Sequence, residues 1–259
     1  MLRIADTRTG RLVEVPSARR HLLRLCVHLP AAPDGPGAAD LRVPLVGDLL
    51  ARTAELHGLQ SHTVLTAPGP ARSPERNQDD LDRALAALGV HPPAVTGTPP
   101  TTDTACAAAD VHVHARGDVP DVAGGVPTEV GAGGAVPPGL LDAAPEPGRD
   151  PLAVRLLLLG RPHAAPVTLD EAALDAAGRT LAHWRRQVAE WAREPSRPVP
   201  AEVLRDARER LADDLDVPAV LALLTAVAES ADIPTGARFE TFALLDRVLG
   251  LDLAREVGS

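Results

Sequence analysis

The sequence changes character at residues 116–149, and this change constrains the fold more than any other feature. Before it, apolar runs of strand length alternate with stretches of helical periodicity. The segment itself is rich in glycine and proline and has few large apolar residues, as is typical of a loop or linker. After it, every signal is helical. We therefore predict an α/β domain over residues 1–115, a linker over 116–149 and a helical bundle over 150–259.

The first half has the pattern of a parallel sheet with crossover helices. Residues 22–29 form an apolar run, residues 45–56 carry apolar side chains at helical spacing, and residues 61–66 are rich in β-branched residues. A strand, a helix and a strand in this order predict a right-handed crossover between parallel strands. A second helix is predicted over 79–88, and the alternating VHVHA of residues 111–115 predicts a further strand.

The second half carries the start and stop signals of about five helices. Asp150 is typical of an N-cap, and Thr168 with Glu171 matches a capping box. The long helix that follows has an apolar stripe that includes Trp184 and Trp191. We expect both tryptophans to lie in the core of the bundle.

Charge and composition exclude several classes of function. The chain has 35 acidic and 26 basic residues and a net charge of −9, which opposes general nucleic-acid binding. The sequence contains no lysine, which excludes a P-loop lysine, a Schiff-base lysine and a lysine general base. It has no apolar run near the roughly 18 residues that span a membrane and no signal-peptide core. We therefore expect a cytoplasmic protein with no membrane association.

The two cysteines, Cys26 and Cys106, cannot form a disulfide framework. In a cytoplasmic protein they are either buried thiols or members of a metal site. Cys26 and His28 share one strand face, as do His112 and His114, because side chains alternate along a strand. These residues can converge on one ion, and thiolates with imidazoles suit zinc. The alternative is that the cysteines are small buried hydrophobes and the histidines lie on a strand surface.

Several segments together resemble a known family. They are MLRIADT at 1–7, LRLC at 23–26, GDLLAR at 47–52, DPLAVRLLLL at 150–159, LADDLDVPA at 211–219 and LDRVLGL at 245–251. Their order resembles the cysteinyl-tRNA synthetases and the closely related cysteine ligases of mycothiol biosynthesis. The resemblance implies a class I synthetase-like Rossmann domain with a parallel sheet, compressed in its middle, followed by an all-α helical bundle.

The resemblance also implies a zinc site. In that family a zinc ion binds the thiolate of the cysteine substrate and so selects it. Cys26 matches the first zinc ligand, Cys106 lies in a segment like the family's Glu-Cys-Ser-Ala, and His114 lies in a segment like its Asp-Ile-His-Gly-Gly-Gly. The segment that supplies the remaining ligands is not recognisable, although Glu129 lies nearby. We therefore predict zinc ligands at Cys26, Cys106 and His114.

The family's two devices for holding ATP phosphates have no counterpart here. Its His-Ile-Gly-His turn corresponds to residues 37–40, which contain no histidine and end in Asp40. Its lysine-rich signature loop corresponds to residues 126–130, VPTEV. Arg42 stands where the family often has arginine, so Asp40 and Arg42 mark the expected nucleotide-binding position. Because removal of one preorganised donor costs about 10²–10³ in rate, we do not expect adenylation by the usual mechanism.

Three functions remain open. The favoured one is a pseudo-ligase that keeps the scaffold and binds a small thiol, an amino acid or a protein partner. The second is an active ATP-dependent ligase that joins cysteine or a similar amino acid to a small acceptor or to tRNA, with arginines in place of lysines. The third is a tRNA-binding module, which the acidic charge balance opposes.

Overall fold

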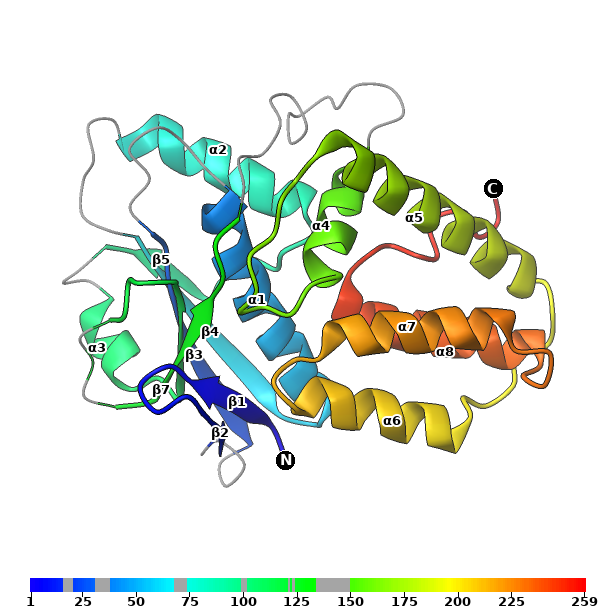
Figure 1. Cartoon of the computed structure of the whole chain (residues 1–259), viewed down its shortest axis with the longest axis horizontal. Helices are drawn as coiled ribbons and strands as arrows, with labels where there is room; N and C mark the ends of the chain where they lie inside the picture. The colour runs from blue at the N-terminus through cyan, green and yellow to red at the C-terminus, as the bar shows by residue number, and fades with distance from the viewer. Residues whose placement is uncertain are drawn as a thin grey trace.

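The computed structural model describes residues 1–15, 21–30, 38–67, 74–98, 102–120, 122, 124–133 and 150–259, except for the side chains of 38–40, 74–78 and 80. Figure 1 shows a sheet with its helices beside a helical bundle. The first part consists of β1 (Arg3–Asp6), β2 (Arg11–Glu14), β3 (Leu22–His28), α1 (Ala38–Leu56), β4 (Gln60–Thr66), α2 (Pro74–Ala87), β5 (Val95–Gly97), α3 (Asp103–Ala107), β6 (Val111–Ala115) and β7 (Val126–Val130). The predicted α/β class is confirmed.

Five parallel strands form the main sheet in the order β5-β4-β3-β6-β7. The chain starts in the middle with β3 and moves outward through β4 and β5. It then returns to the other side of β3 with β6 and β7. The direction of winding therefore reverses between β3 and β6, and α/β sheets bind ligands at such a switch point, beyond the carboxyl ends of the strands.

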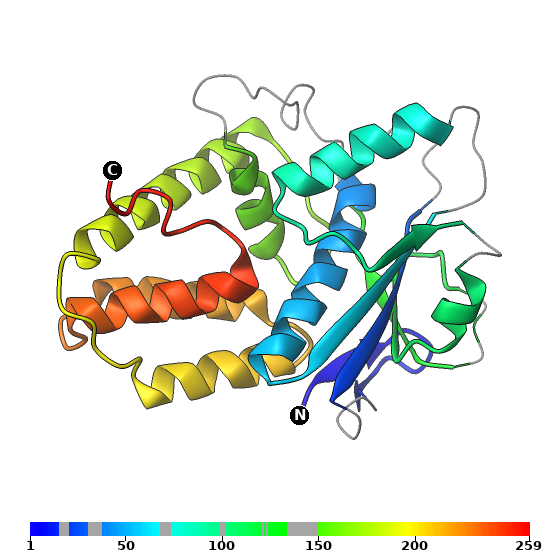
Figure 2. The ribbon, with the colours of Figure 1, turned by 180° about the vertical axis from the view of Figure 1, so that it is seen from behind.

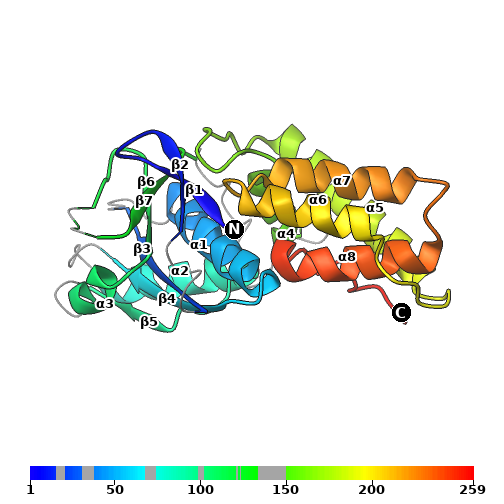
Figure 3. The same ribbon diagram turned by 90° about the horizontal axis from the view of Figure 1, so that it is seen from below.

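The two faces of the sheet are covered unequally. Helices α1 and α2 lie on one face and the short α3 lies on the other (Figures 2 and 3). Helix α1 approaches β3 closely at Gly47, where a Cβ atom would lie 2.6 Å from Cγ2 of Val27. Because Val27 faces α1, its neighbours Cys26 and His28 point to the opposite face.

Helix α1 is buried on all sides. Every side chain over residues 41–54 is buried, because the helix lies between the sheet and the bundle. The predicted helix over 45–56 is confirmed but begins earlier, at Ala38. Pro44, a residue that usually marks a helix boundary, lies inside it.

The bundle consists of α4 (Pro151–Leu159), α5 (Glu171–Trp191), α6 (Ala201–Ala212), α7 (Val217–Glu229) and α8 (Thr235–Leu249). Trp184 and Trp191 are buried and pack edge-on against Phe242, with ring centroids 5.9 and 5.1 Å away, which confirms their predicted core position. The predicted capping box is wrong in its first residue. Asp170, not Thr168, is the N-cap of α5 and accepts a hydrogen bond from the Ala173 amide. No helix in the described ranges is long and apolar enough to cross a membrane.

Part of the predicted linker is a strand. Within residues 116–149, Val126–Val130 forms the edge strand β7, and all its side chains except that of Glu129 are buried. Pro127 lowered the strand signal because it has no amide hydrogen, but an edge strand tolerates proline. Its carbonyl accepts from the Thr7 amide. Residues 134–149 lie outside the described residues, so the linker prediction is not tested there.

The N-terminal segment does not join the parallel sheet as its first strand. Strand β1 pairs antiparallel with β2, with Ile4 opposite Val13. The hairpin packs against β7, and Thr128 Oγ1 donates to the carbonyl of Ala5 at 2.7 Å. Residues 1–7 therefore line the edge of the sheet next to the switch point.

A buried ion network joins the two parts of the chain. Asp48 of α1 accepts hydrogen bonds on Oδ2 from Arg52 Nε and from Arg155 Nη2, both at 2.8 Å. Arg155 of α4 is fully buried and also donates to the carbonyls of Leu88 and Leu249. One carboxylate thus compensates two guanidinium groups that come from different parts of the chain.

We predict that Asp48→Asn lowers the free energy of unfolding by about 3–5 kcal/mol, because it leaves two buried guanidinium groups without their carboxylate. Urea unfolding measures this free energy. The control is Arg3→Gln, which breaks the exposed pair between Arg3 and Asp213 and should cost less than about 1 kcal/mol. Equal losses in both variants would contradict a special role for the network.

Candidate metal centre at the switch point of the sheet

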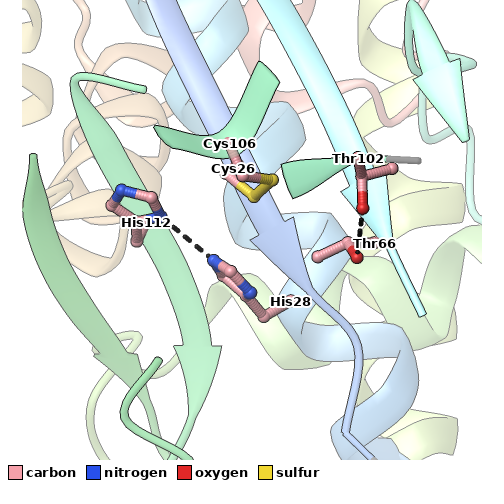
Figure 4. Close-up of a disulfide and its surroundings, with 6 residues drawn as sticks. All are labelled: Cys26, His28, Thr66, Thr102, Cys106 and His112. Carbon is pink, nitrogen blue, oxygen red and sulfur yellow. Dashed lines mark hydrogen bonds between the residues drawn. A yellow bond between two sulfur atoms is a disulfide. The ribbon is translucent and has the colours of Figure 1, made fainter. Parts of the chain in front are cut away.

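The two strands beside the switch point bring a cysteine and three histidines to one face of the sheet. In the β3–β6 pair, Cys26 lies opposite His112, and His28 lies opposite His114. Paired residues of neighbouring strands point to the same side, and these four point away from α1. Figure 4 shows His28 near the carboxyl end of β3, with His112 on the neighbouring strand pointing toward it, and the two sulfur atoms beside them.

Cys26 and Cys106 form a disulfide that links β3 to α3, with their Cα atoms 5.2 Å apart. The sequence-based expectation that they are either free buried thiols or metal ligands does not hold in this state, because no cysteine is free. Two cysteines cannot build a framework, but a single bond requires only that their Cα atoms come within bonding range. The crossover through α3 achieves this across 80 residues of sequence.

His28 and His112 face each other beside this disulfide. His28 Nε2 and His112 Nδ1 are 3.0 Å apart and share a hydrogen bond. Cys26, His28 and His112 each offer one ligand atom, and these atoms lie within 4.8 Å of one another. Sulfur together with imidazole nitrogen is a donor set that suits zinc. In the described part of the chain, these three residues are the set that meets this separation.

The pKa of both imidazoles is lowered from 6.5 to about 4, and burial is the largest cause at each. At His28 the charges of His112 and His114 contribute to this lowering. At His112 the charges of Arg8 and His114 contribute, whereas a backbone hydrogen bond with Gly124 partly offsets them. Both imidazoles are therefore neutral at pH 7, the state in which a ring nitrogen has a lone pair to offer.

The second ring nitrogen of His112, Nε2, lies beside the turn at Gly125. His112 is fully buried, and its Nε2 makes no hydrogen bond of standard geometry among the described residues, although the Gly124 backbone raises its pKa as a hydrogen-bond partner would. Gly125 leaves room on that side, since a Cβ there would lie 2.9 Å from Nε2 and 2.6 Å from the carbonyl of Ala109. Arg8 donates to the Gly125 carbonyl at 2.6 Å, so the hairpin loop holds this turn in place.

The structure places His114 apart from the sulfur atoms. Its Nε2 lies 3.3 Å from Thr7 Oγ1, and its Nδ1 lies 2.9 Å from the carbonyl of Ala115. Glu129 forms an ion pair with Arg116 at 2.6 Å. Of the predicted zinc ligands, the structure brings Cys26 and Cys106 together, whereas His114 is not in the group of possible ligand atoms formed by Cys26, His28 and His112. The shared strand faces seen in the sequence contained this signal, but the pairing of the two strands did not follow from it. The zinc ligands stay a prediction.

The predicted nucleotide-binding residues are only partly described. Arg42 is buried and donates to the backbone carbonyls of Gly131, Pro162 and Ala165. Burial lowers its pKa to about 10, so it stays charged at pH 7. Its guanidinium ties α1 to two loop segments instead of facing open space. The side chain of Asp40 lies outside the described residues, and the nucleotide-binding role of both residues stays a prediction.

The structure has a Rossmann-like parallel sheet, a cysteine–histidine cluster at its switch point and a helical bundle after it. This agrees with the fold that the resemblance in the sequence implies. Comparison with known proteins names the ligases that this chain resembles. It is 45% identical over 84 residues to the "L-cysteine:1D-myo-inositol 2-amino-2-deoxy-alpha-D-glucopyranoside ligase" of Parafrankia sp.. It is 45% identical over 82 residues to the ligase of the same name from Geodermatophilus obscurus, and 38% identical over 104 residues to that from Thermobispora bispora.

The similarity to these mycothiol cysteine ligases confirms the resemblance found in the sequence, over part of the chain. The matched residues cover 32% of this chain and 18% of the Parafrankia and Geodermatophilus proteins. For the Thermobispora protein the shares are 40% and 25%. The chain thus spans about a fifth to a quarter of the length of the curated relatives it matches. No protein-family model matches the chain.

We predict that Gly125→Ala lowers the free energy of unfolding by roughly 2–5 kcal/mol, because it combines an unfavourable φ with overlap of the new Cβ with Ala109 and His112. The φ of Gly125 is +69°, and its added Cβ would lie 2.8 Å from His112 Cδ2. Gly117→Ala is the matched control, since Gly117 has a φ of +85° but no atom within 4 Å of the added Cβ. It should cost only about 1–2 kcal/mol in urea unfolding. Equal costs would show that Gly125 does not determine the space beside His112.

Proposed function

We propose that this protein is a cysteine-ligase-like pseudo-ligase that binds cysteine or a similar small thiol through a zinc ion held by Cys26, His28 and His112. The observation that carries the proposal is the convergence of these three residues at the switch point of a parallel sheet. The names of the relatives support it, since each of those proteins is an L-cysteine ligase.

The three residues fit zinc once Cys26 is a thiolate. A thiolate and two imidazole nitrogens would suit zinc, and the two nitrogens that would hold it, His28 Nε2 and His112 Nδ1, lie 3.0 Å apart. Three protein ligands leave a fourth position open, as in catalytic zinc sites. Bound zinc would supply a Lewis acid that holds a substrate thiol in its deprotonated form.

The protein's own residues then orient and enclose the bound thiol. His28 is half-buried at the open end of β3, whereas His112 is fully buried, so the ligand approaches from the side of His28. Thr66 and Thr102 lie on the same side of the cluster (Figure 4), and their hydroxyl oxygens are 2.8 Å apart. Both threonine side chains are buried and share this hydrogen bond, so they form part of the packed surroundings of the cluster.

No comparable observation supports the reaction of a ligase with the phosphates of ATP. The chain contains no lysine, and Arg42 is already bonded to backbone carbonyls. Positive groups on the phosphates are what make attack on ATP feasible, because like charges must meet. We therefore propose that the protein binds its thiol in the cytoplasm without adenylating it, and that neither tRNA nor a membrane is its partner. In this proposal a protein partner would distinguish the thiol-bound protein from the thiol-free protein.

An active ligase is the second candidate, and the names of the relatives, which are ligases, favour it. In that case arginines would take the place of the lysines on the ATP phosphates, and the thiol amino acid would be joined to a small acceptor. The two functions differ in whether the protein releases pyrophosphate from ATP.

We predict that the reduced, zinc-loaded protein binds L-cysteine in titration calorimetry and prefers it to L-serine on the order of 10²-fold or more, because only a thiolate completes the zinc site well. His112→Ala should remove this binding, as should a chelator. His183→Ala is the control, since His183 is exposed on α5, outside the cluster. Equal affinity for cysteine and serine, or binding that survives chelation, would refute the zinc-mediated mode.

We predict no cysteine-dependent exchange of pyrophosphate into ATP above the background without protein, since the chain has no lysine and Arg42 is bonded to backbone carbonyls. The Thermobispora bispora ligase, assayed in parallel, serves as the positive control. Exchange that depends on cysteine would replace the pseudo-ligase with the active ligase.

A further inference from the structure

The disulfide and the candidate metal set share one sulfur atom. Cys26 is bonded to Cys106, and it is also the sulfur donor of the set completed by His28 and His112. The thiolate is the form of cysteine that binds a metal, and a disulfide sulfur carries no such charge. The disulfide form and the metal-loaded form therefore exclude each other.

We propose that Cys106 is a redox latch that closes the metal site by bonding to Cys26 and opens it when the bond is reduced. The proposal rests on the proposed function, since the latch controls access of zinc to the site that binds the thiol. It gives Cys106 a role different from the ligand role that the sequence implied. Under reducing conditions the protein takes up zinc, and under oxidising conditions it does not.

The two cysteines belong to elements that are held in place by different numbers of interactions. Cys26 belongs to β3, which is hydrogen-bonded to β4 on one side and to β6 on the other. Cys106 belongs to α3, a helix of five residues. The buried residues around the disulfide form a small cluster apart from the main core, namely Cys26, Val64, Cys106 and Ala109. Because few apolar contacts hold α3, it can open locally while β3 keeps its place.

The difference in burial sets the direction of attack. Cys106 has 5% of its surface exposed to solvent, whereas Cys26 has none. A thiolate of an external dithiol attacks Cys106 Sγ, the bond between the two cysteines breaks, and Cys26 leaves as a thiolate. Cys26 is thus released in the form that the metal requires.

A dithiol supplies all the electrons and protons that reduction of the Cys26–Cys106 disulfide requires. The second thiol of the reductant displaces Cys106 from the mixed disulfide, so the reductant ends as a disulfide and the protein gains two electrons. Of the two protons that the dithiol gives up, one goes to Cys106. The other goes to Cys26 in the absence of metal, or to solvent when zinc binds the thiolate. A disulfide oxidant reverses the sequence.

The test measures free thiols and zinc affinity on the full chain in a dithiol buffer and in the cyclic disulfide of the same reagent. Ellman's reagent counts the thiols, and a chromophoric chelator competes for the zinc. In the wild type, oxidation should remove both thiols and weaken zinc binding on the order of 10²-fold or more. In Cys106→Ala, zinc binding should match that of the reduced wild type in both buffers. Cys26→Ala should bind weakly in both, and His183→Ala should behave as the wild type.

Each failure has its own pattern. If zinc stays bound in the oxidising buffer, or if no disulfide forms there, the latch is refuted while the zinc site survives. If Cys106→Ala loses zinc in the reducing buffer although its circular dichroism is native, Cys106 is a ligand and not a latch. If the reduced wild type has two free thiols but binds no zinc, the proposed function itself fails.

Discussion

The buried carboxylate of Asp48 is the interaction on which the rest of the structure depends. It lies on a helix that is buried over residues 41–54, so every charge on that helix must be compensated inside the protein. Its compensation comes from Arg52 on the same helix and from Arg155 on the bundle. The same helix packs on β3 through Gly47. The network thus joins α1 to the bundle, while α1 covers the Val27 face of β3, and Cys26 and His28 lie on the other face.

In a chain without lysine, arginine provides the cross-links between segments. Arg155 donates to the carbonyls of Leu88 and Leu249, near the ends of α2 and α8, where helices leave acceptors unsatisfied. Arg185 donates to the carbonyls of Leu251 and Asp252 in the same manner. The planar guanidinium can satisfy several carbonyls at once, which a lysine ammonium does less well. Arg42 follows this pattern, and so an arginine at a family's phosphate position can serve the fold instead of the substrate.

Local patterns predicted most of the elements, and non-local pairing accounts for most of what they missed. The strand at Leu22–His28 and the bundle helices were found because hydrophobic periodicity is a property of short windows. Strand β7 was missed because Pro127 weakens its local signal, although the neighbouring β6 holds it in the sheet. The same limit applies to the site. The sequence showed that Cys26 shares a face with His28. The register with β6 places His114 opposite His28, and only the side-chain geometry shows that His28 bonds to His112, which lies opposite Cys26.

The location of the cluster explains why one sheet can combine a rigid scaffold with a changeable site. One face of the sheet packs against α1, which lies between the sheet and the bundle. Movement of α1 would break the hydrogen bond between Asp48 and Arg155. The opposite face carries α3, which is short, and the disulfide cluster there is separate from the main core. A segment packed into the main core resists local opening, whereas a segment outside that core can open locally. A bond that forms and breaks at Cys106 therefore changes the chemistry of the crevice while leaving β3, and the two histidines that flank it, in register.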